Sequence, residues 1–472
     1  MSRSGVLALA LLLAACPGPK TAPPPKVTVL AGNRLNVVLI TIDTLRADHL
    51  GTYGYKRNTS PRIDALAHEG VVFEEAYSYW PKTRGSFVAM LTGRRASQTG
   101  YSKAHPMLLG MNPTLASVLK AAGYATAATV DNPNVAKAFG YAKGFDSYRE
   151  TWEEAALATE AARAAAITED GVRALAAARP EQPFLLWLHY VSPHAPYTPP
   201  APFDTAFLDD DAKGGRRLAV VPGDHGGIPK KWAVAGQDRL GYYVAQYDGE
   251  IAAVDQEVGR VLDALRNSAV KDRTLVIVTS DHGESLGEHD YFFDHGENLF
   301  DPSLRIPLVL AGPGVRAGHR SPVFASTLDL VPTVLDAVKV SYPPELAGES
   351  LWPAAQGGLR PNRTRLQAQN DRNLIGVWDR RFKVVATPEG DRMSYALYDR
   401  AADPGETHDV ASRRPDVFRV QRRELELFRQ RLDGEWGRTR GLVEGQSGAQ
   451  KLSDGACEKL KSLNYLGVAG CK

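Results

Sequence analysis

The sequence lacks an excess of charge of either sign: 56 lysines and arginines nearly balance 54 aspartates and glutamates, for a net charge of +2. That balance gives no strong attraction to nucleic acid or anionic lipid. Basic patches interleaved with aromatic residues, typical of nucleic-acid binders, are also absent, so we expect no nucleic-acid partner. The apolar run within the first 16 residues is too short to span a bilayer, and no other apolar run is long enough for a transmembrane helix. The rest, 43% hydrophobic and 23% charged, is typical of a globular protein with one large and one smaller domain.

The N-terminal segment MSRSGVLALALLLAAC contains the one marked apolar run. An Arg near the start, an apolar run of about ten residues and small residues at the end are typical of a secretory signal. We therefore predict a signal peptide over residues 1–15. LAAC at residues 13–16 resembles a bacterial lipobox, which implies cleavage before Cys16 and lipidation of its thiol. The alternative is a plain signal with an incidental cysteine.

A Pro-rich linker is predicted over residues 16–33, which include PGPKTAPPPK. Such a segment stands a folded domain away from a membrane. Pro17 and Gly18 lack the acidic residue that favours inner-membrane retention in some bacteria. We therefore expect an exported lipoprotein, attached to the membrane through its lipid anchor, at the periplasmic face or outer membrane of a bacterium. No protein partner is inferred.

Strand-like and helix-like segments alternate along most of the chain. Short, β-branched apolar runs favour buried parallel strands, and 3.6-residue periodicity favours amphipathic helices. The expected strands are 36–43, 124–130, 183–191, 273–284 and 305–314, and the expected helices are 60–73, 152–178 and 245–265. This alternation predicts an α/β fold with a mostly parallel sheet sandwiched by helices. Residues 203–235, rich in Gly, Asp and Lys, are interpreted as a loop or insertion over the sheet.

The character of the sequence changes near residue 358. LIGVWDRRFKVVAT and YALYDRAADPGE favour hairpin strands, and residues 417–432 form a charged helical pattern. We therefore divide the chain into a catalytic domain at 34–358, a small C-terminal antiparallel α+β unit at 359–440 and a tail at 441–472. The tail carries Cys457 and Cys471, and a pair of cysteines in an exported protein predicts a disulfide. The alternative is two free thiols in a frayed tail.

Polar side chains that suit catalysis follow three of the predicted strands. They are, in chain order, Asp43, His189, His194, Asp281 and His282, with His289 and His295 shortly afterwards. Ligands of open α/β sheets bind at the carboxyl ends of the strands. Each of these motifs is weak alone, but their order and shared position at one sheet edge predict a single site.

The sequence at this point resembles the sulfatase branch of the alkaline-phosphatase superfamily. The motifs that carry the resemblance are NVVLITIDTLRADHLGTYGY, SPRIDALAHEGVVFEEAYS, TRGSFVAMLTGRR, PFLLWLHYVSPHAPYTPP, YDGEIAAVDQEVGRVLDAL, SDHGE, LRIPLVLAGPG and LYDRAADPGETHDVA, roughly over residues 35–415. The resemblance implies an alkaline-phosphatase-like fold and a hydrolase of phosphoric or sulfuric esters with an anionic substrate.

The resemblance also implies a metal site. Asp43, Asp281 and His282 match ligands of one divalent ion, and these ligand types suit Zn, Mn, Mg or Ca. The alternative is that they are capping or loop residues. Many sulfatases have a second aspartate where this chain has Thr44, a poorer ligand.

Further catalytic roles are carried over in the same way. Thr83 matches the nucleophile position, at the start of a helix and eleven residues before Arg94 of LTGR. His194 matches the histidine that contacts the transferred group, and His295 falls where sulfatases often carry a lysine. Either histidine could act as a general acid, or both could be structural. The candidate substrate-binding residues are His189, Lys82 and Arg84, with a structural role for His189 and surface charge for the other two as alternatives.

Thr83 departs from the family pattern. Sulfatases oxidise a Cys or Ser in a Cys/Ser-x-Pro-x-Arg motif to formylglycine, whereas this chain reads Thr83-Arg84-Gly85-Ser86-Phe87. Hydrated formylglycine has two hydroxyls, one to attack sulfate and one to expel it. Threonine has one, so its sulfo-ester would open slowly, whereas its phospho-ester can be released by in-line attack at phosphorus. We expect Ser86 to be the N-cap of the helix.

Three functions remain open. The first is a metal-dependent hydrolase or transferase of phosphoesters, diesters or phosphonate esters above all, with Thr83 as nucleophile. The second is sulfuric ester hydrolysis by an unconventional route. The third is a catalytically silent binding lipoprotein, against which the retained Asp43, Asp281 and His282 speak.

Overall fold

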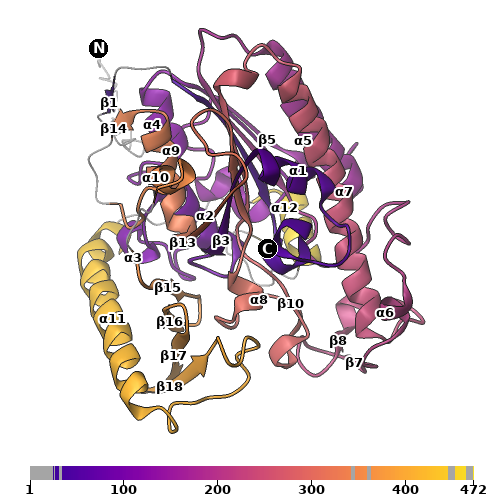
Figure 1. The fold of residues 1–472 in the computed structure, drawn as a ribbon, viewed down its shortest axis with the longest axis vertical. Coiled ribbons are helices and arrows are strands. Elements are labelled where there is room, and N and C mark those ends of the chain that lie inside the picture. The colour runs from indigo at the N-terminus through magenta and orange to yellow at the C-terminus, as the bar shows by residue number, and fades with distance from the viewer. Residues whose placement is uncertain are drawn as a thin grey trace, which may run out of the picture.

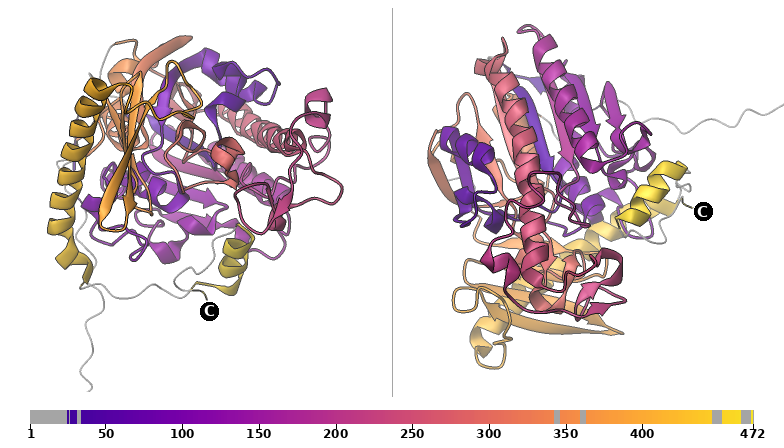
Figure 2. Two further views of the ribbon diagram at one scale, coloured as in Figure 1. Left: turned by 90° about the horizontal axis from the view of Figure 1, so that it is seen from below. Right: turned by 90° about the vertical axis from the view of Figure 1, so that its right-hand side faces the viewer.

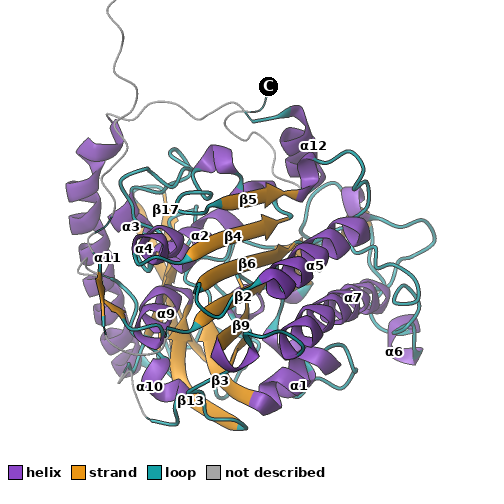
Figure 3. Ribbon diagram, turned by 90° about the horizontal axis from the view of Figure 1, so that it is seen from above, coloured by secondary structure: helices purple, strands orange, loops and turns teal. Residues whose placement is uncertain are grey.

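The computed structural model describes residues 25, 27–30, 34–341, 346–358, 363–444, 452–463 and 471. An eight-stranded sheet forms its centre (Figure 1). The strand order is β13-β3-β12-β9-β2-β6-β4-β5, and Figure 3 shows all of these strands labelled except β12. The strands are β2 (Asn36–Ile42), β3 (Gly70–Tyr77), β4 (Ala125–Val130), β5 (Ser147–Glu150), β6 (Phe184–Tyr190), β9 (Thr274–Ser280), β12 (Leu308–Ala311) and β13 (His319–Ser326). Only β12 runs against its neighbours β3 and β9. The predicted mostly parallel sheet is therefore confirmed.

Helices cover both faces of this sheet, as Figure 3 shows. One face carries α1 (Pro61–Glu69), α5 (Glu160–Ala177) and α7 (Leu240–Arg266), and the other carries α2 (Thr83–Thr92), α4 (Leu115–Ala121), α9 (Leu330–Ala337) and α10 (Trp352–Ala355). Side chains alternate along β2: Val38 and Ile40 pack in the cluster of the first face, Val37 and Leu39 in that of the second. Because both faces are buried, all seven residues of β2 are buried.

Two predicted helices have different bounds in the structure. The helix expected over 60–73 ends at Glu69, and Gly70 begins β3. Val71 and Val72 pair with β12, a contact between segments far apart in sequence that local periodicity does not reveal. The helix expected over 152–178 begins at Glu160, where the Thr159 side chain accepts a hydrogen bond from the Ala162 amide.

The C-terminal unit is a four-stranded antiparallel sheet backed by a long helix (Figure 2, left). Its elements are β15 (Leu366–Gln369), β16 (Ile375–Trp378), β17 (Phe382–Glu389), β18 (Arg392–Asp399) and α11 (Pro415–Glu444). Lys383 of β17 is fully buried and pairs with Asp301 and Glu406. This ion cluster ties the small sheet to the start of α8 (Asp301–Leu304). The predicted antiparallel unit is confirmed.

The two ends of the chain differ in what the structure describes. The predicted signal peptide and Cys16 lie outside the described residues, and of the Pro-rich linker only residues 25 and 27–30 are described. None of the described helices is long and apolar enough to cross a membrane. In the tail, α12 (Asp454–Ser462) packs on the main domain, and a disulfide joins Cys457 to Cys471. Residues 203–235 are mostly loop, with the short elements α6 (Asp210–Lys213), β7 (Val220–Val221) and β8 (Ile228–Pro229).

Candidate active site

The three candidate metal ligands meet at the carboxyl ends of two adjacent parallel strands. Asp43 follows β2, and Asp281 and His282 follow β9. One ligand atom from each lies within 4.8 Å of the others, and all three side chains are completely buried. Sequence reasoning placed them at one sheet edge, and the structure brings them into contact distance of one ion.

Each ligand is held from behind so that one atom faces the shared space. His282 Nδ1 lies 2.9 Å from the Gly283 carbonyl, which leaves Nε2 forward, 3.3 Å from Asp281 Oδ2 and 3.7 Å from Asp43 Oδ1. Asp43 Oδ2 accepts a hydrogen bond from Asn132, and Asp281 Oδ1 accepts one from the His282 amide. Support of metal ligands by such outer partners is typical of metal sites.

The carboxylate oxygens that face the shared space are the ones that accept no hydrogen bond. Within the described residues, Asp43 Oδ1, Asp281 Oδ2 and Thr44 Oγ1 are buried and make no hydrogen bond. Thr44 also has a φ of 56°, which is unfavourable for a β-branched residue. Burial and the neighbouring Asp43 carboxylate raise the pKa of Asp281 well above its usual value. Buried unpaired oxygens are costly, so this donor set fits a divalent cation.

The Thr83 hydroxyl lies against the same cluster. Thr83 is the first residue of α2, is fully buried, and its Oγ1 is 3.2 Å from His282 Nε2. Ser86 does not have the role we expected, because the N-cap of α2 is Lys82. Instead the Ser86 hydroxyl lies inside the helix and donates to the Asp281 carbonyl at 2.6 Å. It therefore anchors α2 to the strand end that carries the ligands.

The residues that replace the modification motif are explained by packing. A Cβ on Gly85 would overlap the Trp80 indole ring, so the proline of the sulfatase motif does not fit there unless Trp80 moves. Phe87 stands in place of the arginine, with its ring 4.8 Å from that of His189.

His189 lies behind the ligand cluster. It is fully buried, its Nδ1 lies 2.9 Å from Thr41 Oγ1, and its Nε2 lies 3.7 Å from Asp43 Oδ2. His189 therefore lies between Asp43 and the Phe87 ring, where it can hold the Asp43 carboxylate in position.

Three histidine rings contact one another beside Thr83, one pair tilted and the other edge to face. The ring of His295 is 4.1 Å from that of His282 and 5.0 Å from that of His194. His194 Nδ1 lies 2.7 Å from the Ala195 carbonyl. His289, by contrast, turns away and stacks on Phe300. Of His289 and His295, only His295 lies beside the candidate metal ligands.

Glu284 is paired with His295, and its position was not predicted. Its Oε1 is 2.9 Å from His295 Nδ1, and it is completely buried. Burial raises the pKa of Glu284 to about 8 and lowers the pKa of His295 to about 3. At neutral pH both shifts describe one arrangement, in which a protonated carboxyl donates to a neutral imidazole.

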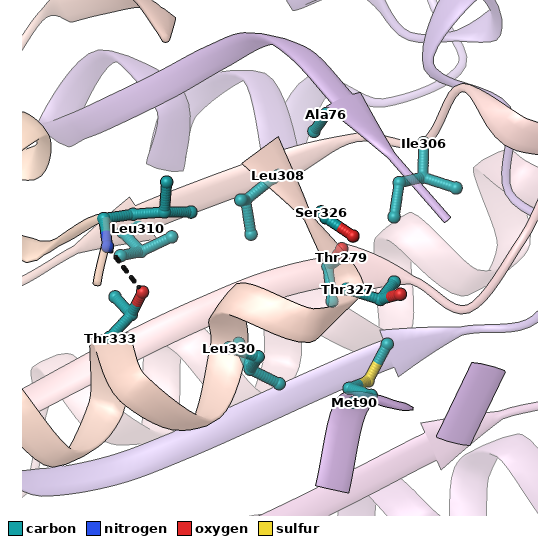
Figure 4. A pocket seen from close by; sticks show the side chains of 11 residues that line it. Ala76, Met90, Thr279, Ile306, Leu308, Leu310, Ser326, Thr327, Leu330 and Thr333 are labelled. Atoms are coloured by element: carbon teal, nitrogen blue, oxygen red, sulfur yellow. Dashed lines mark hydrogen bonds between the residues drawn. The ribbon is translucent and has the colours of Figure 1, made fainter. Parts of the chain in front are cut away.

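A cavity of about 170 Å³ opens beside His295. It is lined by Lys82, Lys103, Asp224, Tyr291, Asp294, His295, Gly296, Glu297, Asp371, Arg372 and Leu463. Of the candidate substrate-binding residues, Lys82 lines it. Arg84 is not surface charge, since it is buried with its guanidinium 3.9 Å from the centre of the Phe139 ring. The apolar cavity of about 20 Å³ in Figure 4 lies inside the core, lined by Met90, Leu330 and their neighbours.

Comparison with known proteins decides the family. The sulfatase family model matches residues 35–340. The chain belongs to the sulfatase family. A second model, of the C-terminal region of N-sulphoglucosamine sulphohydrolase, matches residues 287–430 of this sulfatase-family chain.

The similar proteins include sulfatases and a phosphonate monoester hydrolase. The chain is 25% identical over 426 residues to a Delta 4,5-hexuronate-2-O-sulfatase of Bacteroides thetaiotaomicron, a match that covers 81% of this chain and 85% of that protein. It is 29% identical to the uncharacterized sulfatase YidJ of Escherichia coli, over 80% of this chain and 83% of that protein. Among solved structures, the phosphonate monoester hydrolase of Agrobacterium radiobacter superposes with a TM-score of 0.71 at 23% identity, covering 84% of this chain and 96% of that one.

The family membership and the geometry together confirm the coarse prediction. The protein is a sulfatase-family hydrolase of ester bonds of sulfuric or phosphoric acid, with an anionic ester as substrate. Asn132 and Glu284 were missed as site residues. Asn132 follows β4 at the same sheet edge as Asp43, so the rule that found the ligands would also have found it.

Proposed function

We propose that this sulfatase-family protein is a metal-dependent hydrolase or transferase of phosphoesters, with Thr83 as its nucleophile. The observation that carries the proposal is the position of the Thr83 hydroxyl, 3.2 Å from His282 Nε2 and at the start of α2. A helix start presents amide donors to an anionic ester. Phosphodiesters and phosphonate monoesters are the substrates that suit a single hydroxyl.

Asp43, Asp281 and His282 would hold the cation, with the Thr44 hydroxyl as a further neutral ligand. A divalent ion bound there would favour the ionised Thr83 hydroxyl and offset charge on the ester oxygens. The site has one aspartate fewer than many sulfatases have, because Thr44 replaces it.

The reaction then needs one proton to move twice. The ionised Thr83 Oγ1, whose proton has already passed to solvent, attacks phosphorus. The bond to the leaving alcohol breaks, and His295 Nε2–H gives its proton to the leaving oxygen. The Glu284 carboxyl, 2.9 Å from Nδ1, restores a proton to the ring. Water, or an alcohol in a transferase, next attacks the phospho-threonine at phosphorus and gives up its proton to this pair, and Thr83 is released. His194 is the second candidate donor, since its ring lies 5.0 Å from that of His295.

Sulfuric ester hydrolysis is the second candidate function. The similarity to a Delta 4,5-hexuronate-2-O-sulfatase over most of both chains favours it. Against it stand the missing modification motif and the packing of Trp80 against Gly85, which would have to change before a proline fits there. A silent binding protein is disfavoured by the buried, unpaired ligand oxygens.

A paired rate measurement tests the proposal. Purified protein is assayed with a nitrophenyl phosphodiester, a nitrophenyl phosphonate monoester and nitrophenyl sulfate, with and without added divalent ions. We expect phosphorus esters to be hydrolysed faster, and mass spectrometry of acid-quenched enzyme to find phosphate on the peptide that contains Thr83. Faster sulfate turnover, or an adduct on Ser86, would contradict the proposal.

We also propose that the protein is exported and lipidated at Cys16. The support is the sequence MSRSGVLALALLLAAC and the Pro-rich segment after it. Replacing Cys16 with Ala should release the protein from membranes into the soluble exported fraction. Unchanged membrane fractionation of the variant would refute the anchor.

A further inference from the structure

The wall of the cavity beside His295 is completed by the C-terminal unit. The turn between β15 and β16 brings Asp371 and Arg372 to a cavity that also contains Lys82 and His295. Asn370 fixes this turn, because its Nδ2 donates to the Gly296 carbonyl at 3.0 Å. Its Oδ1 accepts from the backbone amides of residues 372 and 374, each at 3.0 Å. The turn is therefore a built part of the site.

The charged residues of this wall differ in their partners. Arg372 pairs with Glu297, which also lies 3.2 Å from His225 Nε2. Asp294 lies 3.5 Å from the Lys231 ammonium. The Oδ1 atom of Asp371 is buried, and within the described part of the chain it accepts no hydrogen bond. A buried acceptor without a donor costs about 1–3 kcal/mol in general, so a bound donor there would be favoured.

The surroundings of Asp371 are basic. Burial raises its pKa, while the charges of Lys82, Lys103 and Arg84 act against that rise. Lys82, the residue before Thr83, and Asp371 line the same cavity, so this cavity presents both a cation and a carboxylate.

We propose that Asp371 is a specificity-determining residue that accepts a hydrogen bond from a hydroxyl or ammonium group on the alcohol part of the ester. This deepens the proposed function and rests on it. The substrate class is then an ester of a polyol, sugar or amino alcohol, as opposed to a plain alkyl or aryl ester. A site built to bond a donor discriminates against the analogue that lacks it, because its own acceptor is left unpaired.

Three esters of matched length test this inference: the methyl phosphodiesters of propan-1-ol, ethane-1,2-diol and 2-aminoethanol, with the corresponding sulfates in parallel. Wild type should show kcat/KM roughly 10- to 100-fold higher for a donor-bearing ester than for the propyl ester, as expected for one hydrogen bond to a charged group. Asp371→Ala should remove the preference by lowering kcat/KM for the donor-bearing esters to that for the propyl ester. Asp371→Asn should keep part of the hydroxyl preference and lose the ammonium preference, which separates the two donors.

Glu297→Gln is the matched control, since Glu297 lines the same cavity but is already paired. It should retain the donor preference. Equal rates for all three esters in wild type, or an Asp371→Ala loss that is equal for propyl and donor-bearing esters, would overturn the inference.

Binding separates failure of the inference from failure of the proposed function. If wild type turns over none of the esters, the phosphoester proposal fails, and calorimetric binding of the same esters to wild type and Asp371→Ala decides the inference. Tighter binding of donor-bearing esters that disappears in Asp371→Ala supports it. Equal binding of all three overturns it.

Discussion

The inner and outer halves of the active site are built in different ways. The inner half, Asp43, Thr83, Asp281 and His282, is completely buried and comes from the ends of β2 and β9 and the start of α2. The outer half comes from the loop at 203–235, the hairpin of β10 (Ser285–Leu286) and β11 (Phe292–Asp294), and the C-terminal unit. From this difference we expect the reaction to depend on the core sheet and the choice of substrate to depend on the segments around it.

The largest effect is expected at Thr83. Thr83→Ala removes the nucleophile and should lower kcat by about three orders of magnitude or more, while metal content and the unfolding temperature stay near wild type. Steady-state kinetics and metal analysis of the same preparations test this. Wild-type rates in the variant would show that the inner half does not act through this hydroxyl.

Ser86→Ala is the neighbouring control. It leaves the buried Asp281 carbonyl without its donor, so we expect a loss of about 1–3 kcal/mol in the free energy of unfolding. Much of the activity should remain. If Ser86→Ala lost as much activity as Thr83→Ala, the assignment of Thr83 as the nucleophile would be contradicted.

Asp281→Asn should reduce metal content and activity together, because it weakens one of the three ligands. Elemental analysis after dialysis against a chelator measures the first, and turnover with excess metal measures the second. Asp272→Asn, on the exposed surface, is the matched control and should change neither. Full metal content in a triple Ala variant of Asp43, Asp281 and His282 would refute the site.

His295→Ala should lower activity by about 10²–10⁴ for alkyl esters, whose leaving oxygen needs a proton. It should have much less effect on a nitrophenyl ester, whose leaving group departs without one. Glu284→Gln should show the same dependence on leaving group with a smaller loss, since it acts through His295. An equal loss for both kinds of ester would indicate a binding role instead.

The smallest effect is expected from the tail. Replacing both Cys457 and Cys471 with Ala removes a cross-link between residues 14 positions apart in the sequence. The chain-entropy model allows such a cross-link to contribute up to about 3 kcal/mol to the free energy of unfolding. The measured loss in global stability should be smaller, because α12 packs only at the edge of the main domain. Thermal unfolding and peptide mapping under non-reducing conditions check both the loss and the bond.

Sequence patterns were sufficient where a signal is local. The apolar run of β2, the helical period of α7 and the polar residues that follow the strands were all visible in the chain. They failed where a long-range contact decides the outcome. Gly70 leaves a helix and begins β3 because β12 pairs with it, and Ser86 bonds to Asp281 instead of capping α2.

Residue types and their order along the chain were enough to predict the α/β class, the candidate metal ligands and threonine at the proposed nucleophile position. The three-dimensional arrangement was needed to learn that His295 and not His289 lies beside His282, that Glu284 pairs with His295, and that Asp371 of the β15–β16 turn lines the cavity. The physical reason is that these relations depend on packing between segments as far apart as β2 and the β15–β16 turn, and no local pattern encodes the distance between two such side chains.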